Sequence, residues 1–444
     1  MARILILGGG FGGFYTALHL ERVVRRTDHQ VTLVSNENYL LYTPLLPEAA
    51  AGAIEPRHVV VPLRSVLRRT RVNVAEVQHI DVVDHSVVVR TSAEEEQSLD
   101  YDHLVLALGS VPRFDESIPG VREHAVGFKT LAEAIYLRNH VLQQLELAEA
   151  TSDEKGRRAS LTFVFVGGGY AGIEATGELF GLARSALRFY PRLRNEEMRW
   201  MVVEAAQTIL SDFASEIATY AMRRLAGKGI EVRLMTTLKE ARHGAVVLST
   251  GEVVPTRTLV WTTGVTVHPL AAEIPAAKDG HGRLVTTPSL EVPGLPGVWA
   301  LGDIAAVPDE KSGGQPAPAT AQHALQQARL LGRNVAAALA GRPRKAFTFG
   351  TRGMLVTLGD RDGAGRLLGI PVRGLFAWWM TRTYHLFQLP TLARKARVAF
   401  DWTIALCFPR DIAQLGSLAQ IRRDRSPADA NQPADQKTSP RLGQ

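Results

Sequence analysis

Two glycine-rich segments of the 444-residue chain each lie between an apolar run and a helical pattern. The first, ILILGGGFGGF, contains Gly8, Gly10 and Gly13, and the second, LTFVFVGGGYAGIEATGEL, repeats the spacing with Gly167, Gly169 and Gly172. In such a segment the first glycine allows a tight turn and the second lets the backbone approach a pyrophosphate, while the third lets helix and strand pack closely. Two complete copies in this context predict two dinucleotide sites with phosphates at helix N-termini, whereas the plain alternative is two packing turns.

The residue that ends the next strand distinguishes the two sites. Residues 201–203 end at Glu204, whose carboxylate can accept both ribose hydroxyls of NAD and would repel a 2′-phosphate. Residues 205–212 contain no arginine to accommodate that phosphate, so NADH is expected over NADPH. The gap from Gly172 to Glu204 exceeds the usual spacing of about 20 residues, which predicts an extended helix between them. In the first copy Ser35 replaces the acid and offers one weaker contact, with Asn36 or Glu37 as substitutes.

Two further segments fit a flavin. YDHLVLALGS reads as a strand ending in Gly109, and GVWALGDIAAVP reads as a strand ending in Gly302 and Asp303. The carboxylate of Asp303 can bind ribityl hydroxyls while the N-terminus of the following helix faces the phosphates, although a helix N-cap aspartate is the plainer interpretation. Together with the two different ribose positions, these segments predict FAD at the first site and NADH at the second.

The composition limits the chemistry. Cys407 is the only cysteine, which excludes an internal disulfide, a cysteine zinc site, an iron–sulfur cluster and a redox dithiol, so electron transfer would need an organic cofactor. We expect Cys407 to be a small buried apolar residue, and we expect no metal site. A membrane span needs about 20 apolar residues, and the charge-free run 4–20 contains five glycines, which also argues against a secretory signal. The chain is therefore expected to be cytoplasmic.

Positive charge concentrates near the C-terminus. Residues 342–410 contain 12 lysines and arginines against three acids, and this region holds Trp378, Trp379 and Trp402. Segment 374–408 mixes aromatic, leucine and cationic residues at helical spacing, which is typical of amphipathic helices that lie on anionic lipid. The alternative is a basic helical hairpin on the protein's own core, and no nucleic-acid motif accompanies the patch. Residues 422–444 read as a disordered tail.

At this point the sequence resembles the type II NADH dehydrogenases, single-subunit NADH:quinone oxidoreductases of the two-dinucleotide-binding flavoprotein superfamily. The resemblance extends to about residue 421, and its markers are YLLYTPLLPEAAAG (39–52), IPG (118–120), LVWTTGV (259–265), ALGD (300–303) and AQHALQQA (321–328). The last marker matches the family's AQxAxQ quinone-site helix. Relatives that depend on cysteines beside the flavin, the sulfide:quinone oxidoreductases and disulfide reductases, are excluded by the single cysteine.

The resemblance implies a role for each matching residue. It assigns FAD contacts to Gly8, Gly10, Gly12, Gly13, Ser35, Gly109, Gly302, Asp303 and Ala321, and NADH contacts to Gly167, Gly169, Gly172, Glu204 and Gly264. Glu174 matches the glutamate beside nicotinamide and flavin, where it would assist charge or proton movement; the alternative is a carboxylate pair with Glu178 near a helix start. Gln322 and Gln326 match the quinone-facing glutamines, against the alternative of solvent-exposed helix surface. His323 lies on a different helix face and is expected to be structural.

These assignments predict an α/β protein with two Rossmann-like domains, the second inserted in the first. The expected FAD domain comprises residues 1–120 and 275–341, the NADH domain residues 121–274, and a C-terminal membrane-docking module residues 342–421. The expected reaction passes a hydride from NADH to FAD and then reduces a membrane quinone without pumping protons. Alternatives are a soluble NADH-dependent flavoprotein reductase with another acceptor and a membrane-associated NADH sensor without turnover. The expected partners are the quinone, an anionic lipid surface at the cytoplasmic face of the membrane and a second copy in a homodimer, without nucleic acid.

Overall fold

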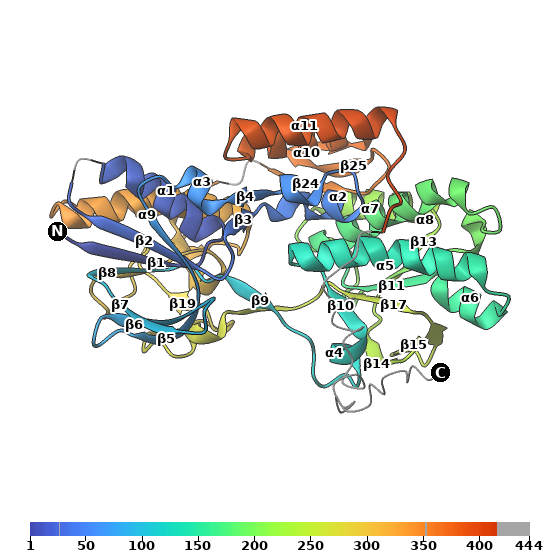
Figure 1. The fold of residues 1–444 in the computed structure, drawn as a ribbon, viewed down its shortest axis with the longest axis horizontal. Helices are drawn as coiled ribbons and strands as arrows, with labels where there is room; N and C mark the ends of the chain where they lie inside the picture. The colour runs from blue at the N-terminus through green and yellow to red at the C-terminus, as the bar shows by residue number, and fades with distance from the viewer. Residues whose placement is uncertain (26, 351–352, 415–444) are drawn as a thin grey trace, which may run out of the picture.

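The computed structural model describes residues 1–25, 27–350 and 353–414. Two α/β lobes lie side by side, and two C-terminal helices form a layer across the top of the view in Figure 1. The first lobe is built on a seven-stranded sheet and the second on a five-stranded sheet. We call residues 353–414 the C-terminal layer. The predicted tail lies outside the described residues.

The seven-stranded sheet of the first lobe is parallel at its centre. Its strands follow the order β20 (Val298–Ala300), β8 (His103–Leu106), β1 (Arg3–Leu7), β2 (Gln30–Ser35), β5 (Arg71–Asp81), β6 (Ser86–Thr91) and β7 (Glu96–Asp100). The pairings from β20 to β5 are parallel, and the last two are antiparallel. Strand β1 is almost wholly buried, as expected for a parallel strand covered on both faces. Helices α1 (Phe11–Val23) and α9 (Ala321–Leu339) pack against each other and share its core.

The second lobe is inserted between the halves of the first. Its parallel strands follow the order β10 (Ala125–Gly127), β17 (Thr258–Trp261), β11 (Thr162–Val166), β12 (Arg199–Val203) and β13 (Ile230–Arg233). Its helices are α4 (Val121–His124), α5 (Leu131–Ala150), α6 (Glu154–Ser160), α7 (Tyr170–Ala186) and α8 (Ser215–Gly227). An antiparallel sheet of β14 (Leu238–Arg242), β15 (Ala245–Leu248) and β16 (Val253–Pro255) completes it. The chain enters through β9 (Ser110–Pro112) and returns through β18 (Val265–Val267), which pair with each other, so the predicted insertion is confirmed.

Short elements complete the first lobe. They are β3 (Tyr39–Leu41), α2 (Leu46–Ala50), β4 (Val60–Pro62), α3 (Leu63–Val66), β19 (Leu284–Val285), β21 (Ala305–Ala306), β22 (Pro308–Asp309) and β23 (Gln315–Pro316). Strands β3 and β4 pair with each other, and α2 lies against α5 and α7 of the second lobe. Helix α2 therefore bridges the two lobes.

The C-terminal layer combines a small sheet with a helical hairpin. It contains β24 (Gly353–Thr357), β25 (Gly363–Leu367), β26 (Ile370–Arg373), α10 (Gly374–Gln388) and α11 (Leu392–Cys407). Trp378 and Trp402 are each only 7 % exposed, and Trp402 joins Tyr42 and Val398 in a core between the hairpin and the first lobe. The aromatic pattern predicts the two helices but not the three-stranded sheet that precedes them in the chain. Among the described residues, the structure shows no helix that is both long and apolar enough to cross a bilayer.

The longer helix expected between Gly172 and Glu204 is confirmed, since α7 has 17 residues against 13 in α1; 3₁₀ turns at residues 187–189 and 195–197 take up further length. The helix expected directly after Asp303 is wrong in detail. Asp303 lies inside a 3₁₀ turn, Gly302–Ile304, and the next α-helix along the chain is α9. The helix is nevertheless close to this turn, because α9 packs against it.

Candidate functional site

The first glycine segment forms the turn between β1 and α1. Gly8 has φ of 105°, and a β-carbon there would lie 2.3 Å from the Ala107 carbonyl oxygen. A β-carbon on Gly13 would lie 1.8 Å from the Gly8 carbonyl oxygen, and one on Gly12 would lie 3.2 Å from Leu301. Gly10, the N-cap of α1, has no atom within 4 Å on that side. The protein's own packing therefore requires Gly8 and Gly13, while Gly10 leaves room for a ligand above the first free N–H groups of α1.

The second segment repeats this geometry between β11 and α7. Gly167 has φ of 113°, and a β-carbon on Gly172 would lie 2.0 Å from its carbonyl oxygen. Gly169, the N-cap of α7, again has open space on its β-carbon side. Gly264, with φ of 74°, lies in the loop after β17, where a β-carbon would meet the Arg113 carbonyl oxygen at 3.2 Å. Each lobe thus presents one helix N-terminus with an open glycine.

Ser35, the last residue of β2, and Glu204, the first residue after β12, each contact the glycine turn of their own lobe. Glu204 accepts hydrogen bonds from the N–H groups of Gly168 at 2.6 Å and Ala206 at 2.8 Å. Ser35 is buried, and its hydroxyl oxygen accepts the Glu37 N–H at 3.3 Å. A β-carbon on Gly9 would lie 2.3 Å from that oxygen, so the Ser35 side chain packs closely against the middle of the first turn. Glu204 likewise lies beside the middle of the second turn, but it forms a hydrogen bond there.

Asp303 belongs to a chain of hydrogen bonds that crosses the lobes. The Ser110 hydroxyl donates to Asp303 Oδ2 at 2.6 Å, and Lys129 Nζ donates to the Ser110 hydroxyl at 2.7 Å and its carbonyl at 2.6 Å. Burial lowers the pKa of Lys129, while the carboxylate of Asp303 opposes that shift. Gly109 and Gly302, with φ of 72° and 73°, have no backbone atom close to their β-carbon positions. Sequence reasoning missed Lys129, which stands just before a helix cap and carries no motif of its own.

The N-terminus of α9 carries the two predicted glutamines. Ala321 is its first residue, after the Thr320 N-cap. Gln322 donates to the Tyr384 hydroxyl of α10 at 3.3 Å, and both Gln322 and Gln326 are half-buried, so the solvent-exposed alternative is wrong. The next residue, Gln327, accepts the Gly302 N–H at 2.8 Å and thereby holds the turn that carries Asp303.

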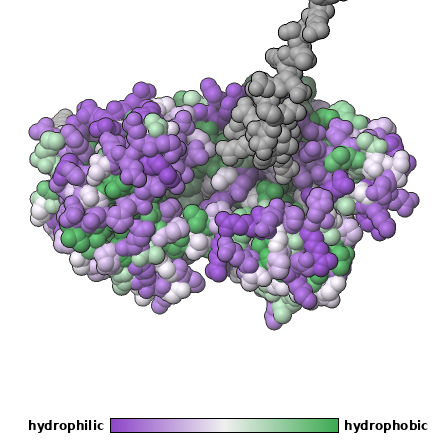
Figure 2. Space-filling model, turned by 60° about the horizontal axis from the view of Figure 1, so that its bottom comes forward, coloured by the Kyte–Doolittle hydropathy of each residue, from purple (hydrophilic) through white to green (hydrophobic). Residues whose placement is uncertain are grey.

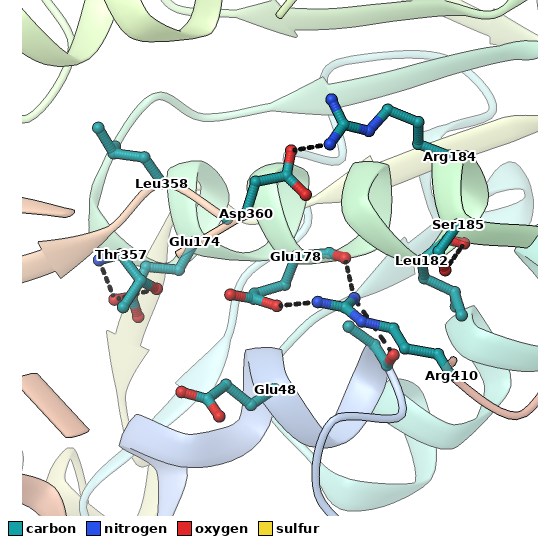
Figure 3. Close-up of polar contacts among 12 residues, drawn as sticks. Glu48, Glu174, Glu178, Leu182, Arg184, Ser185, Thr357, Leu358, Asp360 and Arg410 are labelled. Carbon is teal, nitrogen blue, oxygen red and sulfur yellow. Dashed lines mark hydrogen bonds and ion pairs between the residues drawn. The ribbon is translucent and has the colours of Figure 1, made fainter. Parts of the chain in front are cut away.

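A buried carboxylate cluster lies where α2 and α7 meet (Figure 3). Glu48, Glu174 and Glu178 are all below 5 % exposed, and Glu174 and Glu178 lie four residues apart on α7. Glu178 pairs with Arg410 at 3.1 Å, and Glu48 pairs with Arg382 at 3.0 Å and accepts the Trp402 indole N–H.

Glu174 has neutral donors in place of a cation. Its Oε1 accepts the Thr357 N–H at 2.8 Å and the Thr357 hydroxyl at 3.0 Å. Burial raises its pKa to about 8, against the lowering effect of these bonds. A carboxyl with this pKa exchanges its proton near neutral pH, as a general acid or base requires. Thr357 of β24 was not foreseen, because the sequence gives no sign of that strand.

Helix α10 brings further aromatic groups beside the glutamines. The Tyr42 hydroxyl lies 3.2 Å from His385 Nδ1, and the Tyr384 ring packs edge-to-face on the His385 ring. Burial lowers the pKa of His385 to about 4, so this imidazole is neutral at physiological pH. His323 is buried, and its ring packs on Phe349 and contacts the hydroxyl of Thr320, the N-cap of α9. These contacts fit the structural role expected for it.

Comparison with known proteins identifies the family. The family model for pyridine nucleotide-disulphide oxidoreductases matches residues 2–328. A probable NADH dehydrogenase of Dictyostelium discoideum is 31 % identical, over 93 % of this chain and 91 % of its own. The chain belongs to the pyridine nucleotide-disulphide oxidoreductases and, within them, to the type II NADH dehydrogenases.

Other type II relatives extend over most of the chain. The type II NADH:quinone oxidoreductase Ndh of Mycobacterium tuberculosis is 29 % identical, over 92 % of this chain and 89 % of its own. The structure of NDH2 from Plasmodium falciparum in complex with NADH superposes with a TM-score of 0.84 at 18 % identity, and covers 93 % of this chain and 99 % of its own. The two-lobe fold is therefore that of the type II dehydrogenases.

This type II dehydrogenase has no redox dithiol, although its wider family is described by disulphide chemistry. Cys407, the only cysteine, is exposed at the end of α11, so its predicted burial is wrong. The reason is that its position on α11 faces outward, with the apolar residues Leu406 and Phe408 also exposed beside it.

Proposed function

We propose that this chain catalyses NADH:quinone oxidoreduction with FAD at the first glycine turn and NADH at the second. The observation that carries the proposal is the same open glycine turn at a helix N-terminus in each of the two lobes, together with the hydrogen-bond chain from Lys129 of the second lobe through Ser110 to Asp303 of the first. The half-buried Gln322 and Gln326 lie on α9, which packs against the turn that holds Asp303. FAD, when bound, supplies the group that accepts the hydride and delivers the electrons. The chain supplies its binding site, through Gly10 and the Asp303 carboxylate.

The nicotinamide substrate is selected at Glu204. Its carboxylate faces the second turn, where it can accept the ribose hydroxyls of NADH and repels a 2′-phosphate. Gly167 and Gly172 hold the turn in shape, and Gly169 admits the diphosphate. NADH is therefore the proposed donor.

Glu174 is proposed to hold a proton for quinone reduction. Reduction of a quinone consumes two electrons and two protons, of which NADH supplies the electrons and one proton as hydride, and water the other. Thr357 donates both of its hydrogen bonds to Oε1, and the Tyr170 hydroxyl also interacts with this carboxyl, so Glu174 is held in a fixed position to give or take a proton. The raised pKa of this buried carboxyl supports such a role.

The C-terminal layer is proposed to dock on anionic lipid at the cytoplasmic face of the membrane. Its outer surface exposes large apolar side chains, including Leu375, Phe376, Trp379, Phe387, Leu392, Phe400 and Phe408, each more than half exposed. The face shown in Figure 2, away from α10 and α11, is mainly hydrophilic with scattered apolar areas. Contiguous apolar surface with flanking cations favours an interfacial position, and Gln322 beside α10 would then receive quinone from the lipid.

A spectroscopic assay tests the reaction. NADH should bleach the bound flavin, and a short-chain quinone should restore its absorbance with continuous NADH oxidation. Bleaching without quinone turnover would instead favour a soluble reductase with another acceptor. Absence of flavin would favour a nucleotide sensor.

Vesicle flotation tests docking. Trp379→Glu with Phe400→Glu places two carboxylates on the exposed face and should release the protein from anionic vesicles, whereas Val83→Glu, at an 83 % exposed site on the first lobe, should not. Equal retention of both variants on anionic vesicles would contradict the proposed docking face.

The chain is also proposed to form a homodimer. Light scattering of the purified protein distinguishes this homodimer from a monomer.

A further inference from the structure

A cavity lies under the C-terminal end of α11, away from both glycine turns. Its volume is about 360 Å³, which is within the range of small-molecule sites. Its wall includes Ser185 and Arg188 from the end of α7 and the turn after it, Asp360 and Arg361 between β24 and β25, and Leu406 and Phe408 at the end of α11. Ala53, and Trp378 with Arg382 of α10, complete a lining drawn from five separate chain segments.

The carboxylates of this wall already have cationic partners. Glu178 pairs with Arg410 at 3.1 Å, and Asp360 pairs with Arg184 at 3.4 Å and Lys228 at 3.6 Å. Figure 3 shows the Glu178–Arg410 and Asp360–Arg184 pairs on different sides of α7. Arg382, also in the wall, is neutralised by Glu48. A cation entering this cavity would therefore find no unpaired acid in the described wall.

Two arginines of the wall keep unused donors. Arg188 Nε donates to the Ser185 carbonyl at 3.0 Å, and an Arg361 terminal nitrogen donates to the Leu406 carbonyl at 3.4 Å. Within residues 1–25, 27–350 and 353–414, neither forms an ion pair with a carboxylate. Each guanidinium has five N–H groups in a planar fork that matches the oxygens of a phosphate. The wall thus has a net positive charge with donors suited to an oxyanion.

Two exposed apolar side chains line the same cavity. Leu406 and Phe408 are 48 % and 66 % exposed, and they continue the exposed apolar surface of α11. A free inorganic anion would use the arginines and leave these apolar side chains in water. A ligand with a phosphate and an acyl chain would satisfy both.

We propose that this cavity is a binding site for the phosphate headgroup of an anionic phospholipid. Arg188 and Arg361 bind the phosphate, and the start of an acyl chain lies on Leu406 and Phe408 toward the bilayer. A helix that lies in the interface buries its apolar face at the boundary between headgroups and acyl chains, so side chains at the end of α11 would lie close to the headgroups. The proposal rests on the proposed docking and adds a single saturable lipid site to it.

Titration calorimetry with monomeric dihexanoyl phosphatidic acid on the full chain tests the site without a membrane. We expect one saturable site per chain, weakened about tenfold or more in Arg188→Gln with Arg361→Gln, because charge-assisted bonds to phosphate are lost. The matched control, Arg373→Gln with Arg397→Gln, removes the same charge from exposed positions of the C-terminal layer outside the wall and should bind normally.

Each other outcome overturns the lipid site. Inorganic phosphate that binds as tightly as the lipid would indicate a simple anion site. Equal loss in both double variants would indicate unspecific charge attraction, and the absence of saturation would exclude a site. Flotation and quinone turnover on the same samples separate this result from the proposed function, since the pocket variant should keep turnover with a soluble quinone.

Discussion

The two glycine turns share one backbone design and differ in the side chains that surround it. In both, the first and third glycines contact protein backbone and the N-cap glycine is open. The fifth residue of the following helix is Tyr15 in α1 and Glu174 in α7, and both reach the C-terminal layer. Tyr15 donates to the Gln388 carbonyl at 3.3 Å, whereas Glu174 accepts from Thr357. Under the proposed function, the backbone provides the diphosphate site, and the side chains around it determine which cofactor binds and what chemistry follows.

The largest effects are expected at the open glycines, because these can be filled without disturbing the fold. Gly10→Ala should weaken FAD binding about tenfold or more while the free energy of unfolding of the apoprotein changes by less than about 1 kcal/mol. Gly169→Ala should raise the KM for NADH by a similar factor and keep FAD. The flavin content of the purified protein reports FAD binding, steady-state kinetics give the KM for NADH, and urea unfolding gives the free energy of unfolding. If Gly169→Ala lost FAD instead, the assignment of cofactors to turns would be reversed.

The residue after β12 tests how the second turn selects its ligand. Glu204→Arg should change the ratio of kcat/KM for NADH to that for NADPH by about 10- to 100-fold, since a ribose acceptor is lost and a phosphate partner gained. The change also removes the acceptor of the Gly168 N–H, so some stability is lost. Glu204→Gln is the control that removes charge with little change in shape. An unaltered ratio of kcat/KM in Glu204→Arg would show that Glu204 does not contact the ribose.

The different fifth residues of α1 and α7 predict a pH effect confined to the second turn. In the folded state the Glu174 pKa is about 8, above its ordinary value of 4.5, so the folded protein holds more protons than the unfolded chain between these values. Stability should therefore fall as pH rises from about 5 to 8, and fall less in Glu174→Gln. Quinone reduction in this variant should slow about tenfold or more and lose its dependence on pH near 8. Tyr15→Phe is the matched control and should keep the wild-type pH profile.

The Asp303 chain allows a test of how the second lobe supports the first turn. Lys129→Met removes the cation that holds Ser110, and FAD binding should weaken about fivefold, as for the loss of one buried hydrogen bond. Lys129→Arg should recover part of this affinity because it retains a charged donor. Fluorescence titration of apoprotein with FAD measures both. Equal losses in the two variants would indicate that the fit of Lys129, rather than its charge, matters at this site.

Local sequence patterns predicted the parts of the site that depend on short segments. The fold class followed from glycine spacing after apolar strands, and the insertion of the second lobe is as expected. Thr357 could not be predicted, because it meets Glu174 across 183 positions of sequence and lies on a strand that begins at a glycine and carries no alternating pattern. Lys129 was missed for the same reason, since its importance comes from Ser110 and Asp303 in the other lobe. Cys407 was misjudged because the side of α11 that faces outward depends on packing against the first lobe.

The smallest expected effect concerns Ser35, the position where the two turns differ most in residue type. Its hydroxyl accepts the Glu37 N–H, and the residue is only 4 % exposed, so it is less accessible to a ribose than the partly exposed Glu204. Ser35→Ala should therefore weaken FAD binding by no more than about fivefold, whereas the loss of the Glu204 carboxylate affects the second site more strongly. The same fluorescence titration decides the point, with Glu37→Ala as a test of the alternative ribose partner. If Ser35→Ala released FAD altogether, the first site would depend on its strand-end residue as strongly as the second, and the contrast between the two turns would be wrong.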